Sequence, residues 1–295
     1  MKLFNIDSKQ DLARLLAVGT FEIEQVLGNR GLYYRSFKRR KSDGNFRILY
    51  DPQGPLKLLQ QKVKEHILDR VPLFECVQGG VRGRSVITNA RLHVRKEIVF
   101  SLDIKDFYPS IGPGVVQSIF EALGFSAAIA GLLTDVSTWD NQLPQGVATS
   151  TGLANIAMTR VDVRLSRLAA KQGFGYTRWI DDLTVSGSRR VLDFRRLIQR
   201  IVAEEGFIVR SDKIRTMHSG MRQVVAGVVV NRKPNVAREE RHLIRRGVLR
   251  LRLEREAASL DQIRGKISWL SQVNPVLGAR LAKKLPYVVR AQSRR

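Results

Sequence analysis

The sequence of 295 residues has only one cysteine, Cys76, and only four histidines. A single cysteine excludes an intramolecular disulfide and is typical of a reducing compartment. No apolar run approaches the roughly 20 residues that span a bilayer, and residues 1–12 lack a signal-peptide pattern. We therefore expect a cytoplasmic protein that does not associate with membranes.

Acidic residues are also few, because 27 Asp+Glu stand against 51 Lys+Arg and give a formal net charge of +24. A surplus this large favours a polyanionic partner over a merely basic soluble surface. Half of it lies in residues 232–295, which hold 17 Lys/Arg and 5 Asp/Glu. There, residues 236–256 predict a long helix whose leucines pack and whose arginines meet phosphate. No lipidation signal or aromatic anchor accompanies it, so we prefer nucleic acid to a membrane surface.

Three aspartates carry the clearest chemical signal. Asp181 and Asp182 are adjacent in YTRWIDDLTVSG, residues 176–187, between two runs that alternate as strands do. Asp103 ends the strand-like run of residues 98–103. An Asp–Asp pair alone is more often a turn than a catalytic site, because Asp favours turns.

The order of elements favours the catalytic interpretation. After the first strand come an expected helix over residues 153–170, the Asp–Asp hairpin, a helix from Val191 to before Gly206 and a strand over residues 207–210. This β-α-β-β-α-β order is the split βαβ motif, an antiparallel four-stranded sheet with two helices on one face. Its first strand pairs with its third, so the carboxylate of Asp103 is expected beside the hairpin tip.

Three carboxylates at one sheet edge repel one another unless cations lie among them. Mg²⁺ prefers oxygen ligands, which suits these residues better than the scarce histidine and cysteine would suit another metal. Two Mg²⁺ ions, with Mn²⁺ as an alternative, about 3.5–4 Å apart would activate a primer hydroxyl and stabilise the departing pyrophosphate. The implied chemistry is nucleotidyl transfer.

Further motifs surround these aspartates. YRSFKRRKSDGNFRILYDP begins at residue 34, TNARLH at 88, SLDIKDFYPSI at 101, LPQGVATSTGLAN at 143 and RQVVAGVVVNRKPNV at 222. With RWIDDL, they resemble the motifs of reverse transcriptases from about residue 33 to 275. TNARLH and VAG are similar to the N-A-x-x-H and V-T-G motifs of bacterial retrons, although Ala226 stands where that family has Thr.

The resemblance implies an α+β right-hand polymerase with fingers, a split βαβ palm and a helical thumb. Residues 1–94 would form N-terminal helices and fingers, residues 95–231 the palm with a fingers insertion at about 112–140, and residues 232–295 the basic thumb. Such an enzyme uses dNTPs to copy a structured non-coding RNA into DNA from an internal 2′-hydroxyl. Its product is a branched RNA–DNA hybrid (msDNA), usually serving antiphage defence with a separate effector protein. Nothing after Pro275 resembles an RNase H or endonuclease domain, so we expect template removal by another nuclease.

The resemblance also implies roles for individual residues. Asp103, Asp181 and Asp182 would be the catalytic metal ligands, with Ile104 as a further metal and nucleotide contact. Lys213 would protonate the leaving pyrophosphate, unless it is an ordinary surface lysine. The nucleotide-binding residues would be Arg47, Arg40, Ile104, Tyr108, Gln145 and Gly146. The RNA-binding residues would be Asn89, His93, Val225, Ala226, Gly227, Arg241, Arg245, Arg246 and Arg250.

Plainer alternatives accompany several of these roles. Tyr108, expected to lie under the sugar and disfavour a 2′-hydroxyl, could instead be a packed core tyrosine. The segment Pro144–Gly146 could be an ordinary turn, and Asn89 and His93 could brace a turn or support the RNA-binding surface. Ile180 stands where retrons usually have Ala, and its stiff β-branched side chain predicts slower or less processive synthesis.

Three other functions remain open. A group II intron-like or other bacterial defence reverse transcriptase would share the aspartates but use a linear primer. A basic RNA-binding scaffold with a decayed active site would not be an enzyme, and all three aspartates argue against it. A polymerase that works without a template is the third.

Overall fold

The computed structural model describes residues 2–40, 44–254 and 260–285. Its α-helices are α1 Lys9–Leu16, α2 Thr20–Asn29, α3 Gly54–His66, α4 Val86–Arg91, α5 Pro113–Leu123, α6 Ala127–Ser137, α7 Ser150–Ala157, α8 Thr159–Gln172, α9 Val191–Glu204, α10 Arg238–Glu254, α11 Leu260–Val273 and α12 Pro275–Ala282. Its 3₁₀ helices are η1 Arg30–Tyr33, η2 Leu68–Arg70 and η3 Ser211–Lys213. Its strands are β1 Tyr34–Arg40, β2 Phe46–Pro52, β3 Ile98–Asp103, β4 Gly175–Trp179, β5 Asp182–Gly187, β6 Arg215–His218, β7 Val224–Val225 and β8 Val228–Val229.

The centre of the molecule is a four-stranded antiparallel sheet with the order β4-β5-β3-β6. The strand β3 lies inside the sheet, and its nearly continuous apolar sequence is buried on both faces. It pairs with β5, the third strand along the chain, and the register sets Asp103 opposite Asp182. The predicted pairing of the first strand with the third is therefore confirmed.

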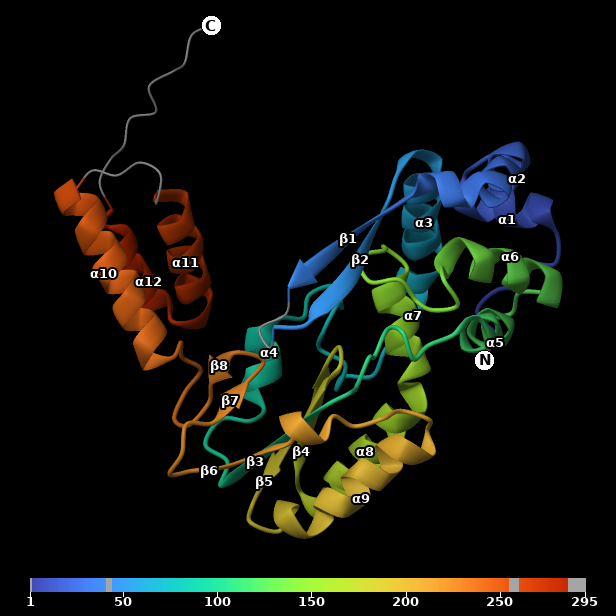
Figure 1. Ribbon diagram of the computed structural model, residues 1–295. Helices are drawn as coiled ribbons and strands as arrows, with labels where there is room; N and C mark the ends of the chain where they lie inside the picture. Colours follow the sequence, from blue (N-terminus) through green and yellow to red (C-terminus); the bar gives the residue numbers. More distant parts are fainter. Residues whose placement is uncertain (1, 41–43, 255–259, 286–295) are drawn as a thin grey trace, which may run out of the picture.

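One face of the sheet is covered by α8 and α9, which lie side by side in Figure 1. The apolar residues Val161, Leu165 and Ala169 are buried on one side of α8 at helical spacing, together with Asp162, and the C-cap Gly173 adopts a left-handed φ of 68°. These helices share the larger hydrophobic core with Phe100 and Leu102 of β3. The two-layer α+β arrangement follows from this packing.

Two elements differ from the sequence predictions. The helix expected over residues 153–170 is interrupted at Met158, where the hydroxyl of Thr159 donates to the carbonyl of Ile156 at 2.6 Å. Residues 207–210 form only an isolated bridge, between Val209 and Ile104, and the fourth strand is β6. The chain passes the end of β3 before it turns through η3 and pairs, so the expected strand was placed too early.

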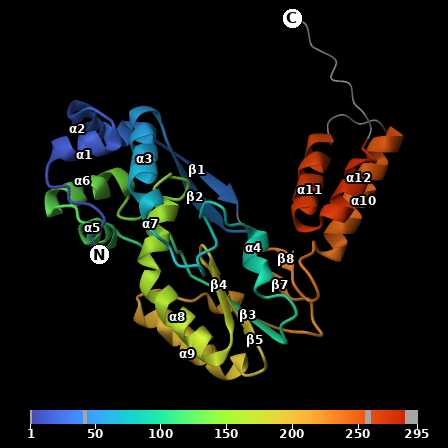
Figure 2. The same ribbon diagram turned by 180° about the vertical axis from the view of Figure 1, so that it is seen from behind.

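The opposite face of the sheet carries α4 and the β7–β8 hairpin, which share a second core with the helices α10, α11 and α12. We call these three helices the C-terminal bundle. Figures 1 and 2 show that the bundle and the β1–β2 hairpin rise from the same side of the sheet. Over the described ranges, no helix has the length and apolarity to cross a bilayer.

The long basic helix is confirmed as α10, while the expectation that its leucines pack is only partly right. Ile244, Val248 and Leu251 are buried on one face, whereas Leu243 and Leu249 are 53% and 54% exposed. At 3.6 residues per turn, these two leucines fall to either side of the packed face. The expected helix residues after 254 lie outside the described residues.

Candidate active site

The hairpin tip and the end of β3 bring the three aspartates together. The turn residues Ile180 and Asp181 connect β4 to β5, and Asp182 begins β5 opposite Asp103. The amide of Ile104 donates to the carbonyl of Asp181 at 3.0 Å, which ties the tip to the end of β3. The topology thus joins residues that are nearly 80 positions apart in the sequence.

The acidic cluster holds more negative charge than its surroundings neutralise. Burial raises the pKa of Asp182 to about 7, and the charges of Asp181 and Asp103 add to this effect. Burial also raises the pKa of Asp181, with a contribution from Asp103, against the opposing charges of Lys213 and Arg47. A site with this charge excess and oxygen donors fits a hard divalent cation.

The arrangement of these carboxylates is not a preformed metal cage. In the part of the chain that the structure describes, no three His, Cys, Asp or Glu side chains are grouped so as to hold a metal ion. The ammonium of Lys213 contacts both carboxylate oxygens of Asp103, at 3.2 and 3.1 Å. Because Mg²⁺ is commonly held by one or two carboxylates together with substrate phosphates, the residues still fit that ion.

The position of Lys213 follows from the segment between α9 and β6. The carbonyl of Ile208 accepts from the amide of Lys105, and the amide of Arg210 donates to the carbonyl of Asp103 at 2.8 Å. These bonds dock the segment against the end of β3, and η3 then presents Lys213 to Asp103. The structure therefore brings the predicted general acid to the acidic cluster.

A cavity of about 180 Å³ lies between β2 and the loop before α7. Arg47, Tyr50, Asp106 and Gln145 are among its lining residues. The side-chain oxygen Oε1 of Gln145 is buried without a hydrogen-bond partner, which is unusual for a buried polar atom. Arg47 and Gln145, both predicted to contact the nucleotide, thus share one cavity.

Comparison with known proteins identifies the family. The family model described as reverse transcriptase (RNA-dependent DNA polymerase) matches residues 39–257, most of the chain. The chain belongs to the reverse transcriptase family. The α+β right-hand polymerase fold predicted from the motifs is thereby confirmed, and members of this family use divalent metal ions.

Among curated relatives, the chain is similar to retron reverse transcriptases. Retron Mx65 reverse transcriptase of Myxococcus xanthus is 34% identical over 278 residues, which cover 85% of this chain and 64% of that protein. Retron Mx162 reverse transcriptase of the same species is 31% identical, with 94% and 66% covered. Retron Ec86 reverse transcriptase of Escherichia coli is 27% identical, with 91% and 85% covered. The predicted resemblance to retrons is confirmed, and the chain spans about two thirds of the Myxococcus proteins.

In this reverse transcriptase fold, residue 146 must be a glycine for a structural reason that the motif did not reveal. Its φ is +102°, and a Cβ there would lie 2.6 Å from the carbonyl oxygen of Tyr50. The amide of Tyr50 donates to the carbonyl of Gln145 at 2.8 Å. The close backbone approach at Gly146 is therefore made by β2 of the protein itself, which fixes the loop that carries Gln145.

The basic companion of Arg47 differs from the prediction. In the β1–β2 register Arg39 stands opposite Arg47, while Arg40 stands opposite Phe46. Directly opposed residues share one face of an antiparallel pair. Arg39 therefore lies on the same face of the hairpin as Arg47, and Arg40 lies on the other face. The register therefore favours Arg39 over Arg40.

Ile104 directly follows Asp103 in the chain, and Tyr108 lies close enough to Asp181 for its charge to act on the tyrosine. The hydroxyl of Tyr108 is 3.1 Å from that of Thr151, and burial raises the pKa of this half-buried tyrosine. Tyr108 packs against the larger hydrophobic core, as the alternative interpretation of this residue expected. Its contact with the incoming sugar stays a prediction. The side chain of Ile104 is buried, so a contact from this residue to a metal or nucleotide would use its main-chain oxygen.

The prediction that Asn89 and His93 contact RNA directly is wrong. Both side chains are buried in the core. The ring nitrogens of His93 lie 2.7 Å from the hydroxyls of Ser186 and Thr177, on β5 and β4. His93 therefore braces the turn that follows α4 against the sheet, which corresponds to the supporting role that the sequence left open.

In the V-A-G segment, residues 225–227, the first residue is buried and the other two form a turn. Val225 is buried, which contradicts direct RNA contact by its side chain. Ala226 and Gly227 form the two-residue turn between β7 and β8, with φ of 45° and 82°. In α10, Arg245, Arg246 and Arg250 are exposed and Arg241 is partly buried, so three of the four predicted arginines are open to solvent.

Sequence reasoning missed a buried polar network behind the hairpin. Arg178 and Asp162 are fully buried and joined by an ion pair, with Tyr176 and Asn155 bonded to them. Two signals in the sequence could have indicated it. Asp162 lies on the apolar side of α8 beside Val161, and Arg178 shares a strand face with Tyr176.

Proposed function

We propose that the chain is the RNA-directed DNA polymerase of a retron. The observation that carries the proposal is the convergence of Asp103, Asp181 and Asp182 at the end of β3, with Lys213 bonded to Asp103 and the charges of Lys213 and Arg47 acting on Asp181. In this proposal residues 1–94 form N-terminal helices and fingers, and residues 95–231 form the palm with an insertion at about 112–140. The C-terminal bundle forms the thumb.

The residues divide the chemistry of nucleotidyl transfer among them. The three aspartates would hold two Mg²⁺ ions, with Mn²⁺ as an alternative, and these ions would supply Lewis-acid activation and charge neutralisation. Arg47 binds the triphosphate, and Gln145 orients the nucleotide through its unpartnered oxygen. Lys213, already beside Asp103, donates a proton to the departing pyrophosphate. Tyr108 lies under the incoming sugar and disfavours a 2′-hydroxyl.

We further propose that the template is a structured non-coding RNA bound by the basic surface of the C-terminal bundle. Synthesis begins from a 2′-hydroxyl within that RNA and gives a branched RNA–DNA hybrid in the cytoplasm. The similarity to retron reverse transcriptases supports this proposal. A role in antiphage defence, together with a separate effector protein, is part of the same proposal.

The test is dNTP incorporation on a primed RNA template with Mg²⁺, with Asp181→Asn as the variant. Removing one ligand from the cluster is expected to lower the rate by roughly 10³-fold, because ion-mediated charge stabilisation contributes several kcal/mol. Asp193→Asn in α9 is the matched control, because this aspartate lies in the first turn of α9, is exposed and should not affect the rate. Incorporation that survives Asp181→Asn would exclude this mechanism, and incorporation without template would indicate a templateless polymerase.

The retron assignment has its own readout in the nucleic acid that co-purifies with the protein. A single abundant small RNA–DNA species with a 2′-linked branch is expected. Linear products alone would instead favour a group II intron-like enzyme.

A further inference from the structure

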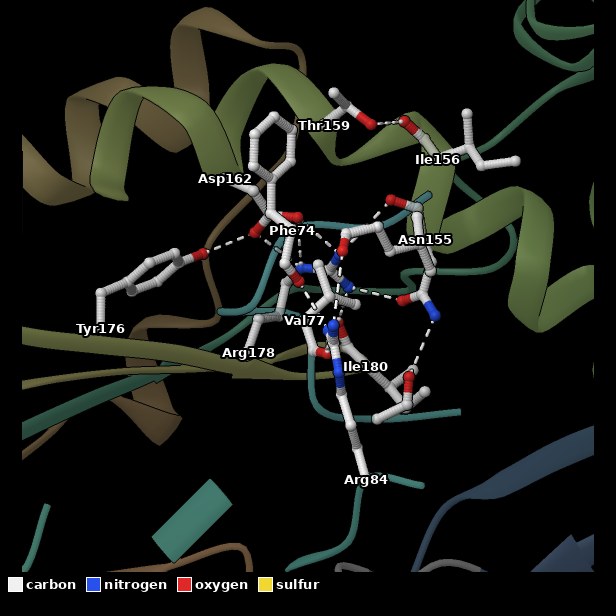
Figure 3. Close-up of polar contacts among 12 residues, drawn as sticks. Phe74, Val77, Arg84, Asn155, Ile156, Thr159, Asp162, Tyr176, Arg178 and Ile180 are labelled. Atoms are coloured by element: carbon white, nitrogen blue, oxygen red, sulfur yellow. Dashed lines mark hydrogen bonds and ion pairs between the residues drawn. The ribbon is translucent and has the colours of Figure 1, made fainter. Parts of the chain in front are cut away.

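A buried polar network lies directly behind the tip of the β4–β5 hairpin (Figure 3). Its centre is the guanidinium of Arg178, a side chain with no exposed surface. Nε and Nη2 donate to the carboxylate of Asp162 in α8, at 2.9 and 2.7 Å. Nη1 donates to the side-chain oxygen of Asn155 in α7 and to the main-chain carbonyl of Ile180, each at 2.9 Å. One side chain thus connects two helices to the turn that precedes Asp181.

The groups around Arg178 are themselves fixed. The hydroxyl of Tyr176 donates to Asp162 at 2.8 Å, which orients the carboxylate. The main chain of Arg178 is bonded on both sides, since its amide donates to the carbonyl of Cys76 at 2.7 Å and its carbonyl accepts from the amide of Gln78 at 2.8 Å. The backbone that carries the guanidinium is therefore fixed in place, and the hydrogen bond from the guanidinium to Ile180 is directional.

The turn has a physical need for such a bond. Ile180 adopts a φ of 57°, in the left-handed region that is unfavourable for a β-branched residue. Its side chain packs against Gly79, where a Cβ would lie 2.6 Å from the amide nitrogen of Ile180 and 2.8 Å from its Cγ1. Asn155, held by Arg178, donates to the carbonyl of Gly79 at 3.0 Å. The same network thus holds both the turn and the segment that receives the Ile180 side chain.

The conformation of Ile180 fixes the direction of the chain into the acidic cluster. The carbonyl of Asp181 must meet the amide of Ile104, and Asp182 must enter β5 opposite Asp103. If Ile180 relaxed to a negative φ, the peptide that leads into Asp181 would rotate and both carboxylates would move. Strain at a functional turn persists only when the surrounding structure over-determines it.

We propose that Arg178 is a positioning residue for nucleotidyl transfer: through its bond to the carbonyl of Ile180, it holds the catalytic hairpin in the left-handed turn that places Asp181 and Asp182. Asp162 and Asn155 orient Arg178 for this task. Arg178 touches no reacting atom. The inference rests on the proposed polymerase function for its kinetic consequence, while its structural content can be measured independently.

The principal variant is Arg178→Gln combined with Asp162→Asn. Replacing both partners avoids an unpaired buried charge, which would endanger folding, and the amide oxygen introduced by Asp162→Asn can still accept from Tyr176. The expected result is a fall in kcat of roughly 10²-fold, the effect of misplacing catalytic groups by about 1 Å. KM for dNTP should change little, because Arg47 and Gln145 lie outside the network.

A rescue experiment separates positioning from general core packing. Glycine adopts a positive φ without steric cost, so adding Ile180→Gly to the double variant should restore kcat by about tenfold or more. In the otherwise unchanged chain, Ile180→Gly should give a much smaller gain, limited to relief of the steric effect that the sequence predicts for the Ile180 side chain. If Arg178 served only the core, the additional glycine would remove packing and lower the activity further.

Hydrogen–deuterium exchange of the peptide covering residues 179–183 provides the measurement that does not depend on activity. Exchange in that peptide should rise in the double variant, while exchange in β3 and α8 stays as in the unchanged chain. Arg164→Gln is the matched control, because Arg164 also extends from α8 but pairs at the surface with Glu204 and Glu205. It should alter neither exchange nor kcat.

The outcomes are decisive in each case. Unchanged exchange at residues 179–183, or a loss of kcat that glycine does not restore, would overturn the proposal. If the double variant does not fold, Arg178→Lys replaces it, because one ammonium keeps the charge beside Asp162 but cannot bond Asp162, Asn155 and Ile180 together. If the unchanged protein incorporates no dNTP, the proposed function fails. The exchange experiment still tests whether Arg178 holds the hairpin turn.

Discussion

His93 shows at the scale of one residue how burial determines chemistry. Its ring is enclosed between α4 and the sheet, and both nitrogens lie close to hydroxyls of Thr177 and Ser186. Burial lowers the pKa of His93 from 6.5 to about 3, and the charge of Lys96 adds to the effect. The histidine is therefore neutral in the folded protein at every pH at which a polymerase would be assayed.

The lowered pKa of His93 predicts that acid weakens the fold through this residue. In the unfolded chain His93 takes up a proton below pH 6.5, while in the folded chain it does so only near pH 3. Its contribution to stability is therefore complete above pH 6.5 and declines as the pH falls from 6.5 towards 3. Between pH 7 and 5 the unchanged protein should lose about 2 kcal/mol more unfolding free energy than His93→Gln.

Urea unfolding at pH 7, 6 and 5 measures this difference. His218→Gln is the matched control, since His218 is exposed at the end of β6, and it should keep the pH dependence of the unchanged protein. Equal pH dependence in His93→Gln and the unchanged protein would contradict the argument.

Residues of the site differ in how far the sequence could predict them. The aspartates were predictable, because strand order alone determines that Asp103 meets the hairpin. The hydrogen-bond partners of His93 and Arg178 were not, because a polar residue is buried only when groups from distant elements satisfy it. Sequence spacing cannot show that Thr177 and Ser186 lie on the sheet face that receives His93.

At the scale of elements, local periodicity predicted the helices and the hairpin well. It failed where the chain is held by isolated contacts, as at residues 207–210, whose apolar residues resemble a strand but form a single bridge. It also missed the break at Met158, because the apolar positions of α7 and α8 continue across it. Strand pairing depends on neighbours that are remote in the sequence, so boundaries and partners require the tertiary structure.

The β7–β8 hairpin allows a prediction about one element. Its central residues Ala226 and Gly227 both have left-handed φ, as in a type I′ turn, for which Asn-Gly is the preferred pair. Alanine pays a steric cost in this conformation that asparagine largely avoids. Ala226→Asn should therefore raise the unfolding free energy by roughly 0.5–1 kcal/mol.

Denaturant unfolding monitored by circular dichroism would measure the gain. Ala170→Asn is the control, because Ala170 is exposed in α8, where asparagine is a poorer helix former than alanine. A loss of stability in both variants would mean that the turn does not carry the expected strain.

At the scale of the whole molecule, charge is distributed in a way that predicts where nucleic acid binds. The net charge of +24 is shared by many surfaces, but half of it belongs to residues 232–295. Arg245, Arg246 and Arg250 are exposed on α10, whereas Ile244 and Val248 hold that helix in the second core. The bundle thus presents cations from a packed scaffold, on the same side of the sheet as the β1–β2 hairpin (Figures 1 and 2).

This arrangement predicts the salt dependence of RNA binding. Each arginine that neutralises a phosphate releases counterions, so the logarithm of affinity falls with the logarithm of salt concentration by about 0.7–0.9 per contact. Replacing Arg245, Arg246 and Arg250 by alanine should make that slope shallower by about 2–3. Fluorescence anisotropy with a structured RNA, over a KCl series that brackets the roughly 0.15 M physiological range, measures the slope.

The matched control removes the same amount of positive charge from α9, on the other face of the sheet from the C-terminal bundle. Arg195, Arg196 and Arg200 are exposed on α9, which covers the face opposite the second core. Their triple replacement by alanine lowers the net charge equally but should leave the slope unchanged, because short-range phosphate contacts release counterions whereas distant charges are screened. Equal changes in both variants would show that binding follows total charge and not a surface built by the bundle.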